Sequence, residues 1–203
     1  MTPSGRLATT AERFCLPPLA AATLIPTLIA ALFLAATARG EVMAADERGF
    51  ALHNEVQVSV DRARAYQAFV TEIAQWWNPD HTISGQSAQL FLDPRPMGCF
   101  CESTGEGSGM VHMIVTLATP PAMLRLTGGL GPLGLQGVSG NLTVEFVAQD
   151  ESQTQVIAQY TVGGYSPDGL AAQAPAVDAV IDDLLSRFAG WVEVGTPEPD
   201  IVE

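Results

Sequence analysis

The strongest constraint on the fold is a run of short apolar segments, each closed by a turn signal, followed by one long helical repeat. Pro and Gly clusters divide residues 87–162 into segments of strand length, and hairpin-length connections require neighbouring strands to pair antiparallel. After Gly169 the apolar spacing changes to three and four residues, which predicts one amphipathic helix that ends at Gly195. The expected strands are Phe50–Val60, Ser87–Asp93, Cys99–Thr104, Met110–Thr119, Met123–Thr127, Asn141–Gln149 and Thr154–Val162.

An earlier helix is expected between the first two of these strands. Asp61 has the side chain of a good N-cap, and the apolar positions that follow it are spaced three and four apart as far as Trp77. The Asn78–Asp80 segment, with Pro79 at its centre, stops that helix. The predicted fold class is therefore α+β: a curved antiparallel sheet of about seven strands wrapped on a long C-terminal helix.

The N-terminus has the layout of a secretory signal peptide. Two arginines precede a long apolar segment rich in Ala and Leu, and Ala36-Thr37-Ala38 resembles a cleavage site. An uncleaved membrane anchor formed by residues 16–38 is the alternative, because about 20 apolar residues span a bilayer. The expected organisation is a signal peptide at 1–38, a linker at 39–49, a domain at 50–195 and an acidic tail at 196–203. The expected location is secreted or periplasmic.

The charge balance bears on possible partners. The chain carries a formal net charge of −13 and contains no lysine. Such a chain repels phosphate backbones and anionic lipid surfaces, so nucleic acid is not an expected partner. Membrane contact is expected only if the N-terminal segment stays attached.

Several segments together resemble a known superfamily over roughly Phe50 to Gly195. They are Glu55–Val60 before the first helix, Trp76-Trp77, Met97-Gly98-Cys99-Phe100, Pro120-Pro121 after a strand, and Gly163-Gly164-Tyr165 before the last helix. The chain is similar to the SRPBCC superfamily (START, polyketide cyclase, Bet-v-allergen-like). Within it, the chain resembles the branch of activator of heat-shock-90 ATPase homologue-like proteins. A cytosolic co-chaperone role does not suit a secreted domain.

This resemblance implies a helix-grip fold with an internal cavity for a small apolar or amphipathic ligand. Some members have adapted the cavity for cyclase, dehydratase or hydrolase chemistry. We therefore expect ligand binding between the sheet and the C-terminal helix, in the cell envelope. The alternatives are an enzyme that works in the same cavity and a protein-interaction module with a filled core.

Glu102 and His112 are the candidate catalytic pair. The hairpin loop Gly105–Gly109 joins their strands, so that pairing Thr104 with Met110 would place the two side chains opposite each other. A carboxylate that orients an imidazole inside an apolar cavity makes a general base. The alternative is a hydrogen-bonded pair on the solvated face of the sheet, and a slip of one residue would separate the groups.

Other polar residues give weaker signals. His81 is expected as an exposed loop histidine that Asp80 could pair with. The three histidines fit no metal-binding spacing, so no metal or other cofactor is predicted. Cys99 and Cys101 share one face of a strand. We expect them as two small buried hydrophobes, with a labile disulfide in an oxidising compartment as the alternative.

The predicted ligand contacts are mostly large apolar side chains. The Gly-rich segment Gly128–Gly140 is expected as a mobile flap over the cavity, or alternatively as part of the core. Aromatic residues of the two helices and of the last strands are expected near the cavity, although aromatics also dominate cores. The candidates are Trp76, Trp77, Phe100, Ile114, Leu130, Leu133, Tyr160, Tyr165 and Phe188.

Overall fold

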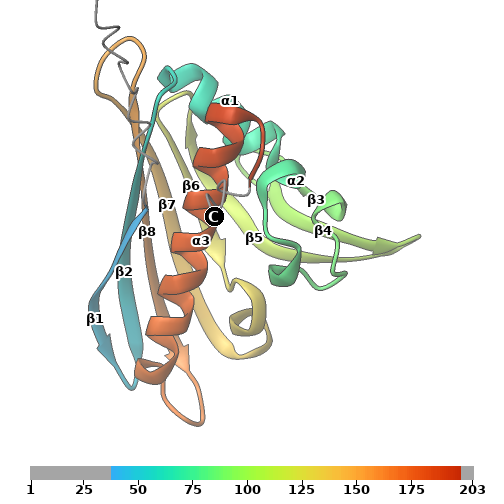
Figure 1. The fold of residues 1–203 in the computed structure, drawn as a ribbon. Helices are drawn as coiled ribbons and strands as arrows, with labels where there is room; N and C mark the ends of the chain where they lie inside the picture. Colours follow the sequence, from blue (N-terminus) through green and yellow to red (C-terminus); the bar gives the residue numbers. More distant parts are fainter. Residues whose placement is uncertain (1–37, 198–203) are drawn as a thin grey trace, which may run out of the picture. The chain divides into compact units, whose positions relative to one another are not determined.

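The computed structural model describes residues 38–197, which belong to one unit and contain one antiparallel sheet of eight strands (Figure 1). The order across the sheet is β1-β2-β8-β7-β6-β5-β4-β3, so the first and last long strands, β2 and β8, pair with each other next to the edge strand β1. The fold is α+β, as expected, with one strand more than the sequence indicated. The strands are β1 (Arg39–Asp46), β2 (Gly49–Val58), β3 (Leu90–Leu92), β4 (Cys99–Gly105), β5 (Ser108–Thr119), β6 (Met123–Gly128), β7 (Gly137–Ala148) and β8 (Thr154–Tyr165).

The additional strand is β1, which occupies most of the segment expected to be a linker. It forms a hairpin with β2, from Arg39 opposite Glu55 to Asp46 opposite Gly49. The carboxylate of Asp46 accepts the N–H groups of Arg48 and Gly49 and so closes the turn. The prediction of a linker at 39–49 is wrong, since most of this segment is strand β1. The strand could not be recognised in the sequence because β1 is an exposed edge strand whose small and polar residues show no apolar alternation.

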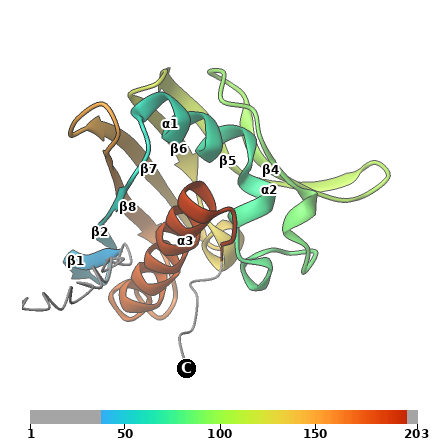
Figure 2. The same cartoon turned by 45° about the horizontal axis from the view of Figure 1, so that its top comes forward.

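Two short helices and one long one cover one face of the sheet (Figures 1 and 2). Helix α1 (Arg62–Thr71) begins as predicted, with the Asp61 carboxylate accepting the N–H groups of Ala63 and Arg64. The expected single helix to Trp77 is broken at Glu72, whose φ of −117° leaves the helical region, and α2 (Ile73–Trp76) follows. Helix α3 (Ala174–Val194) has Pro175 in its first turn and ends at Gly195 with φ 78°.

Glu72 explains why the chain breaks where it does. Its carboxylate accepts hydrogen bonds from the guanidinium of Arg64 on α1 and, at 2.7 Å, from the indole nitrogen of Trp191 on α3. The Arg64 hydrogen bond, reinforced by the one from Trp191, lowers the pKa of Glu72 despite its partial burial. One charged group thus joins α1 to α3 at the corner between α1 and α2.

Short 3-10 turns replace strand or loop at four places. The expected strand at 87–93 is a 3-10 turn followed by the three residues of β3, and the Gly-rich flap contains another such turn. The four turns are η1 (Pro79–His81), η2 (Ser87–Gln89), η3 (Gly131–Leu135) and η4 (Ala171–Gln173).

The core is an aromatic cluster between the C-terminal half of α3 and the sheet. Phe188 is fully buried, and its ring lies 5.4 Å from Trp76 and 5.5 Å from Phe69. Phe69 also contacts Phe146 of β7, which ties α1 to the sheet. Burial of one such side chain is worth roughly 1.5–3 kcal/mol. This cluster fills the space where Trp76 and Phe188 were expected to contact a ligand, so that prediction is wrong for both.

Two predicted segments lie largely outside the described residues. The signal peptide predicted at 1–38 falls there except for its last residue, and so does most of the tail at 196–203. Among the described residues, none of the helices combines the length and the apolar character needed to cross a bilayer.

Candidate functional site

A pocket of about 610 Å³ opens beside the N-terminal half of α3. Its walls come from the loop after α2, from the segment around η3 (residues 128–136, called the η3 segment below) and from the start of α3, and His112 of β5 lies at its edge. This volume falls within the range of roughly 300–1,000 Å³ that is typical of small-molecule sites. The lining residues are Trp77, Asp80, His81, Thr82, Ile83, His112, Leu130, Gly131, Pro132, Leu133, Leu135, Ala172, Gln173, Ala176, Val177, Val180 and Ile181.

The pocket is mainly apolar and has a small number of polar groups. Leu130 and Leu133 of the η3 segment lie on one side, and the aliphatic stripe of α3 that continues from the core lies on the other. The polar side chains come from Asp80, His81, Thr82, His112 and Gln173. A few placed polar groups in an apolar cavity are the usual pattern of a site that orients a small molecule.

His112 is in the pocket because β5 contains a β-bulge. Cys101 pairs with Val111 and Phe100 pairs with Met113, so that His112 is the extra residue on β5. His112 and Met113 are consecutive, yet both are buried, at 5% and 1% exposure. A regular strand would send one of them to the opposite face. Bulges are frequent next to active sites because they re-aim a side chain in this way.

The contact between Glu102 and His112 is present, although the register that predicted it is wrong. Glu102 pairs with Met110 rather than with His112. The bulge nevertheless brings the imidazole Nε2 within 3.0 Å of the carboxylate Oε2, and both side chains are almost completely buried. The pair therefore lies on the inner face of the sheet and not on the solvated one. Its catalytic role stays a prediction.

The Glu102 carboxylate is held in its ionised form. Burial raises its pKa, but hydrogen bonds from the Ser84 side chain and from the Ile83 and Ser84 backbone N–H groups, together with His112, outweigh burial and lower it. An ionised carboxylate only accepts hydrogen bonds, so the proton between the two groups belongs to His112 Nε2. In the neutral imidazole Nδ1 then carries a lone pair, and no described contact of this residue occupies that atom.

The ring of Phe100 packs against the imidazole. The ring of Phe100 lies 5.0 Å from His112 at an interplanar angle of 30°, and 4.7 Å from Trp77. Phe100 was expected to contact the ligand, but it does not line the pocket. Its ring instead packs against two residues that do, His112 and Trp77. Positioning by a packed neighbour of this kind determines where the imidazole nitrogens point.

A second histidine borders the same pocket. His81 was expected as an exposed loop residue, but its side chain is about one-third exposed, and its Nε2 lies 3.8 Å from the Asp183 carboxylate. Asp183 also accepts a hydrogen bond from Asn78, and the indole of Trp77 donates to the His81 carbonyl. The expected partner Asp80 borders the pocket as well but makes no described ion pair with His81.

The η3 segment is anchored at both ends. The hydroxyl of Tyr160 donates to the Gly128 carbonyl and accepts the Leu130 N–H, both at 3.3 Å. Burial raises the pKa of Tyr160 to about 12, so the phenol stays protonated. At the other end the amides of Gln136 and Gln173 exchange hydrogen bonds at 3.1 and 3.3 Å. This segment is the wall of the pocket, and Leu133 packs into the core.

The expected ligand contacts divide into three groups. Trp77, Leu130 and Leu133 line the pocket. Tyr160 is fully buried and anchors the η3 segment instead. Ile114 alternates with the buried Met113 and Val115 and so lies on the other face of β5, while Tyr165 is 73% exposed. The residues that the prediction missed include Val177, Val180 and Ile181. Their signal was the apolar stripe of α3, which is equally typical of a core helix.

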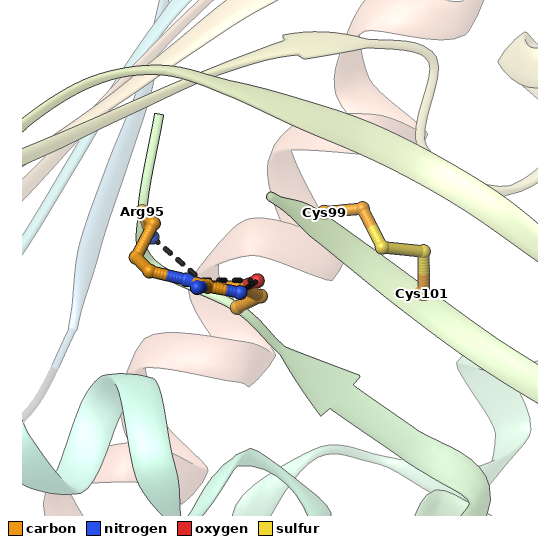
Figure 3. Close-up of a disulfide and its surroundings, with 4 residues drawn as sticks. Arg95, Cys99 and Cys101 are labelled. Atoms are coloured by element: carbon orange, nitrogen blue, oxygen red, sulfur yellow. Dashed lines mark hydrogen bonds and ion pairs between the residues drawn. A yellow bond between two sulfur atoms is a disulfide. The ribbon is translucent and has the colours of Figure 1, made fainter. Parts of the chain in front are cut away.

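Cys99 and Cys101 form a disulfide, so the expectation of two reduced, buried side chains is wrong (Figure 3). Their Cα atoms are 5.4 Å apart, which is a usual separation for a disulfide. Residues 38–197 contain no group of three or more His, Cys, Asp or Glu side chains placed to hold a metal ion.

Comparison with known proteins supports the fold alone. No family model and no curated protein matches the sequence. A conserved protein of unknown function from Enterococcus faecalis superposes with a TM-score of 0.55 at 13% identity, over 83% of this chain and 82% of that one. An uncharacterised protein from Rhizobium leguminosarum gives 0.50 at 19% identity, over 75% and 97%. A protein from Arthrobacter aurescens gives 0.51 at 12% identity, over 80% and 99%.

Proposed function

We propose that this protein binds a small, mainly apolar molecule with a hydrogen-bonding group, in the pocket between the η3 segment and α3. The observation that carries the proposal is the combination of an apolar pocket of about 610 Å³ with the buried His112–Glu102 pair at its edge. The helix-grip-like arrangement and the resemblance to SRPBCC proteins support the same function. The signal-like N-terminus supports a place in the cell envelope.

The chemistry of the pocket indicates how such a molecule would lie. Its apolar body would contact the leucines of the η3 segment and the aliphatic side chains of α3. A body that buries about 300 Å² of apolar surface gains roughly 7 kcal/mol before the entropy of association is subtracted. Its hydroxyl or similar donor would reach the lone pair on His112 Nδ1.

An enzyme that works in the same pocket is the second candidate. Glu102 accepts hydrogen bonds from Ile83 and Ser84 of one loop and contacts His112 of β5, and it holds His112 in the tautomer that leaves the Nδ1 lone pair free for a ligand. This is the arrangement of a general base oriented by a carboxylate. A hydrolase, dehydratase or cyclase reaction would use that base on a bound ligand.

Ligand binding is tested by filling the pocket. Ala176 and Ala179 are both exposed residues of α3, but only Ala176 lines the pocket. We expect Ala176→Trp to weaken binding of an apolar fluorescent probe such as 1-anilinonaphthalene-8-sulfonate at least tenfold, and Ala179→Trp to leave it unchanged. Native mass spectrometry of the isolated protein should also show a bound molecule that is lost on denaturation. Equal probe binding by both variants would contradict the proposal and favour an interaction module.

The enzymatic candidate needs a separate measurement. Hydrolysis of 4-nitrophenyl esters with acyl chains of increasing length tests hydrolase chemistry at the pocket. His112→Gln should abolish the protein-dependent rate, whereas His53→Gln should not, because His53 lies on β2 beside Glu55 and away from the pocket. Equal loss of the rate in both variants, or no loss in either, would remove His112 from the reaction.

A further inference from the structure

The Cys99–Cys101 disulfide lies directly behind the candidate site. Phe100, between the two cysteines, packs on His112 and Trp77 from the inner face of β4. Glu102, the next residue after the disulfide, binds His112 and the 83–84 loop. The two cysteine side chains leave β4 together and are joined by the disulfide (Figure 3). Strand alternation places them on the face opposite to Phe100.

This disulfide contributes little to folding. Cross-links stabilise a protein mainly by closing long loops in the unfolded chain, and the gain falls with loop length. Here the two cysteines are separated by a single residue on one strand. The pairing of β4 with β3 and β5 already holds the backbone of this residue, Phe100, in the strand. Stability of the native state is therefore not a sufficient reason for the bond.

The bond is also within reach of another protein. Cys99 is partly exposed, whereas Cys101 is buried. On the same face Cys101 pairs with Phe91 of β3 and Val111 of β5, which are 51% and 54% exposed. The three side chains form an apolar row across three strands, with the disulfide at its centre. A partner protein could pack apolar residues around its reactive thiol against this row.

We propose that Cys99–Cys101 is a reversible redox centre that exchanges with the dithiol of a partner protein, and that its state sets the position of His112. The partner thiolate attacks Sγ of the more accessible Cys99, the S–S bond breaks, and Cys101 leaves as a thiolate that takes a proton from water. The second thiol of the partner then attacks the mixed disulfide and releases Cys99. The partner is oxidised to a disulfide, and the cysteine pair gains two electrons and two protons.

The link to the site is mechanical. The strand ladders hold Phe100 in both redox states, and the disulfide adds a constraint on its torsion angles that reduction removes. The imidazole of His112 and the indole of Trp77 rest on the Phe100 ring, so a small change in its orientation reaches both. The same constraint acts on the peptide that leads into Glu102. A shift there moves the acceptor that determines the tautomer of His112. This coupling does not depend on whether the pocket binds a ligand.

The redox centre is tested on the isolated full chain. The protein is equilibrated in glutathione buffers of graded ratio, alkylated with N-ethylmaleimide and digested. The peptide that holds both cysteines should change from no alkyl group to two, reversibly, while circular dichroism stays native. Dithiothreitol, a dithiol, should reduce it faster than monothiols at equal thiolate concentration. A bond that resists reduction until the protein unfolds would overturn the proposal.

The coupling to His112 has its own readout. The 15N shifts of the His112 ring nitrogens are compared before and after reduction. We expect them to move on reduction and the double variant Cys99→Ser/Cys101→Ser to show the reduced values with or without reductant. His53, on β2, serves as the internal control and should not move. Unchanged His112 shifts with a reversibly reduced disulfide would reject the coupling and retain the exchange reaction.

Discussion

His112 Nε2 lies 3.0 Å from Glu102 Oε2, although the strand partner of Glu102 is Met110, two residues before the histidine. The contact depends on one extra residue in β5, which gives His112 and Met113 the same inward direction. The carboxylate in turn holds the loop at Ile83 and Ser84, which borders the pocket. One buried anion therefore joins β4, β5 and the loop after α2.

Glu102→Gln should lower stability in a pH-dependent way. The pKa of Glu102 is lowered in the folded protein, so its stabilisation is complete above its ordinary pKa near 4.5 and is lost as pH falls through the lower folded value. We expect the variant to lose about 3 kcal/mol of unfolding free energy at pH 7, as for a broken buried pair. Urea unfolding between pH 7 and pH 3 should show the two curves converging in acid.

The matched control is Glu106→Gln, at an exposed position in the turn between β4 and β5. Its unfolding free energy should follow that of the wild type at every pH. A constant difference between wild type and Glu102→Gln down to pH 3 would show that the hydrogen bonds matter and the charge does not.

Tyr160→Phe should loosen the η3 segment without disturbing the sheet. The substitution removes the only described partner of the Leu130 N–H and leaves that buried donor unpaired, at a cost of about 1–3 kcal/mol. Amide hydrogen exchange of residues 130–136 should become faster, while exchange in β7 and β8 changes little. Tyr165→Phe removes the same hydroxyl from an exposed tyrosine and should have no such effect.

Asp182→Asn should stabilise the protein at neutral pH. Burial, with the neighbouring Asp178 and Asp183 carboxylates, raises the pKa of Asp182, and its Oδ1 is buried without a partner among the described residues. A raised acid costs stability above its unfolded pKa, near 3.8, and costs nothing below it. We expect a Tm about 2–4 °C higher at pH 7, a gain that disappears near pH 3. Asp168→Asn, in an exposed turn, should leave Tm unchanged.

Most of the fold could be predicted because apolar period and turn residues are local signals. Asp61, Pro175 and Gly195 mark the helix ends where the structure has them. The break at Glu72 could not be predicted, since it depends on Arg64 and on Trp191, which is distant in sequence. Edge strand β1 was missed because its residues have no buried face to reveal it.

The site was harder to predict than the fold. The hairpin between β4 and β5 turns tightly, with Gly105 opposite Ser108, and Thr104 is left outside the pairing. The five-residue loop assumed from Gly105–Gly109 therefore gave a wrong register. The lining of the pocket by Val177 and Val180 was not apparent either, because an apolar stripe does not reveal which half of α3 meets the core and which half meets a cavity.

The bulge in β5 also means that the His112 position is not part of the regular strand pairing. If His112 were deleted, Val111 would still face outward and Met113 inward, and the bulge between β5 and β4 at this point would disappear. The imidazole is thus an insertion into a strand whose alternation of inward and outward residues does not depend on it. In evolutionary terms, this sheet could gain or lose its imidazole through a change of one codon in length, with the inward and outward alternation of β5 unchanged.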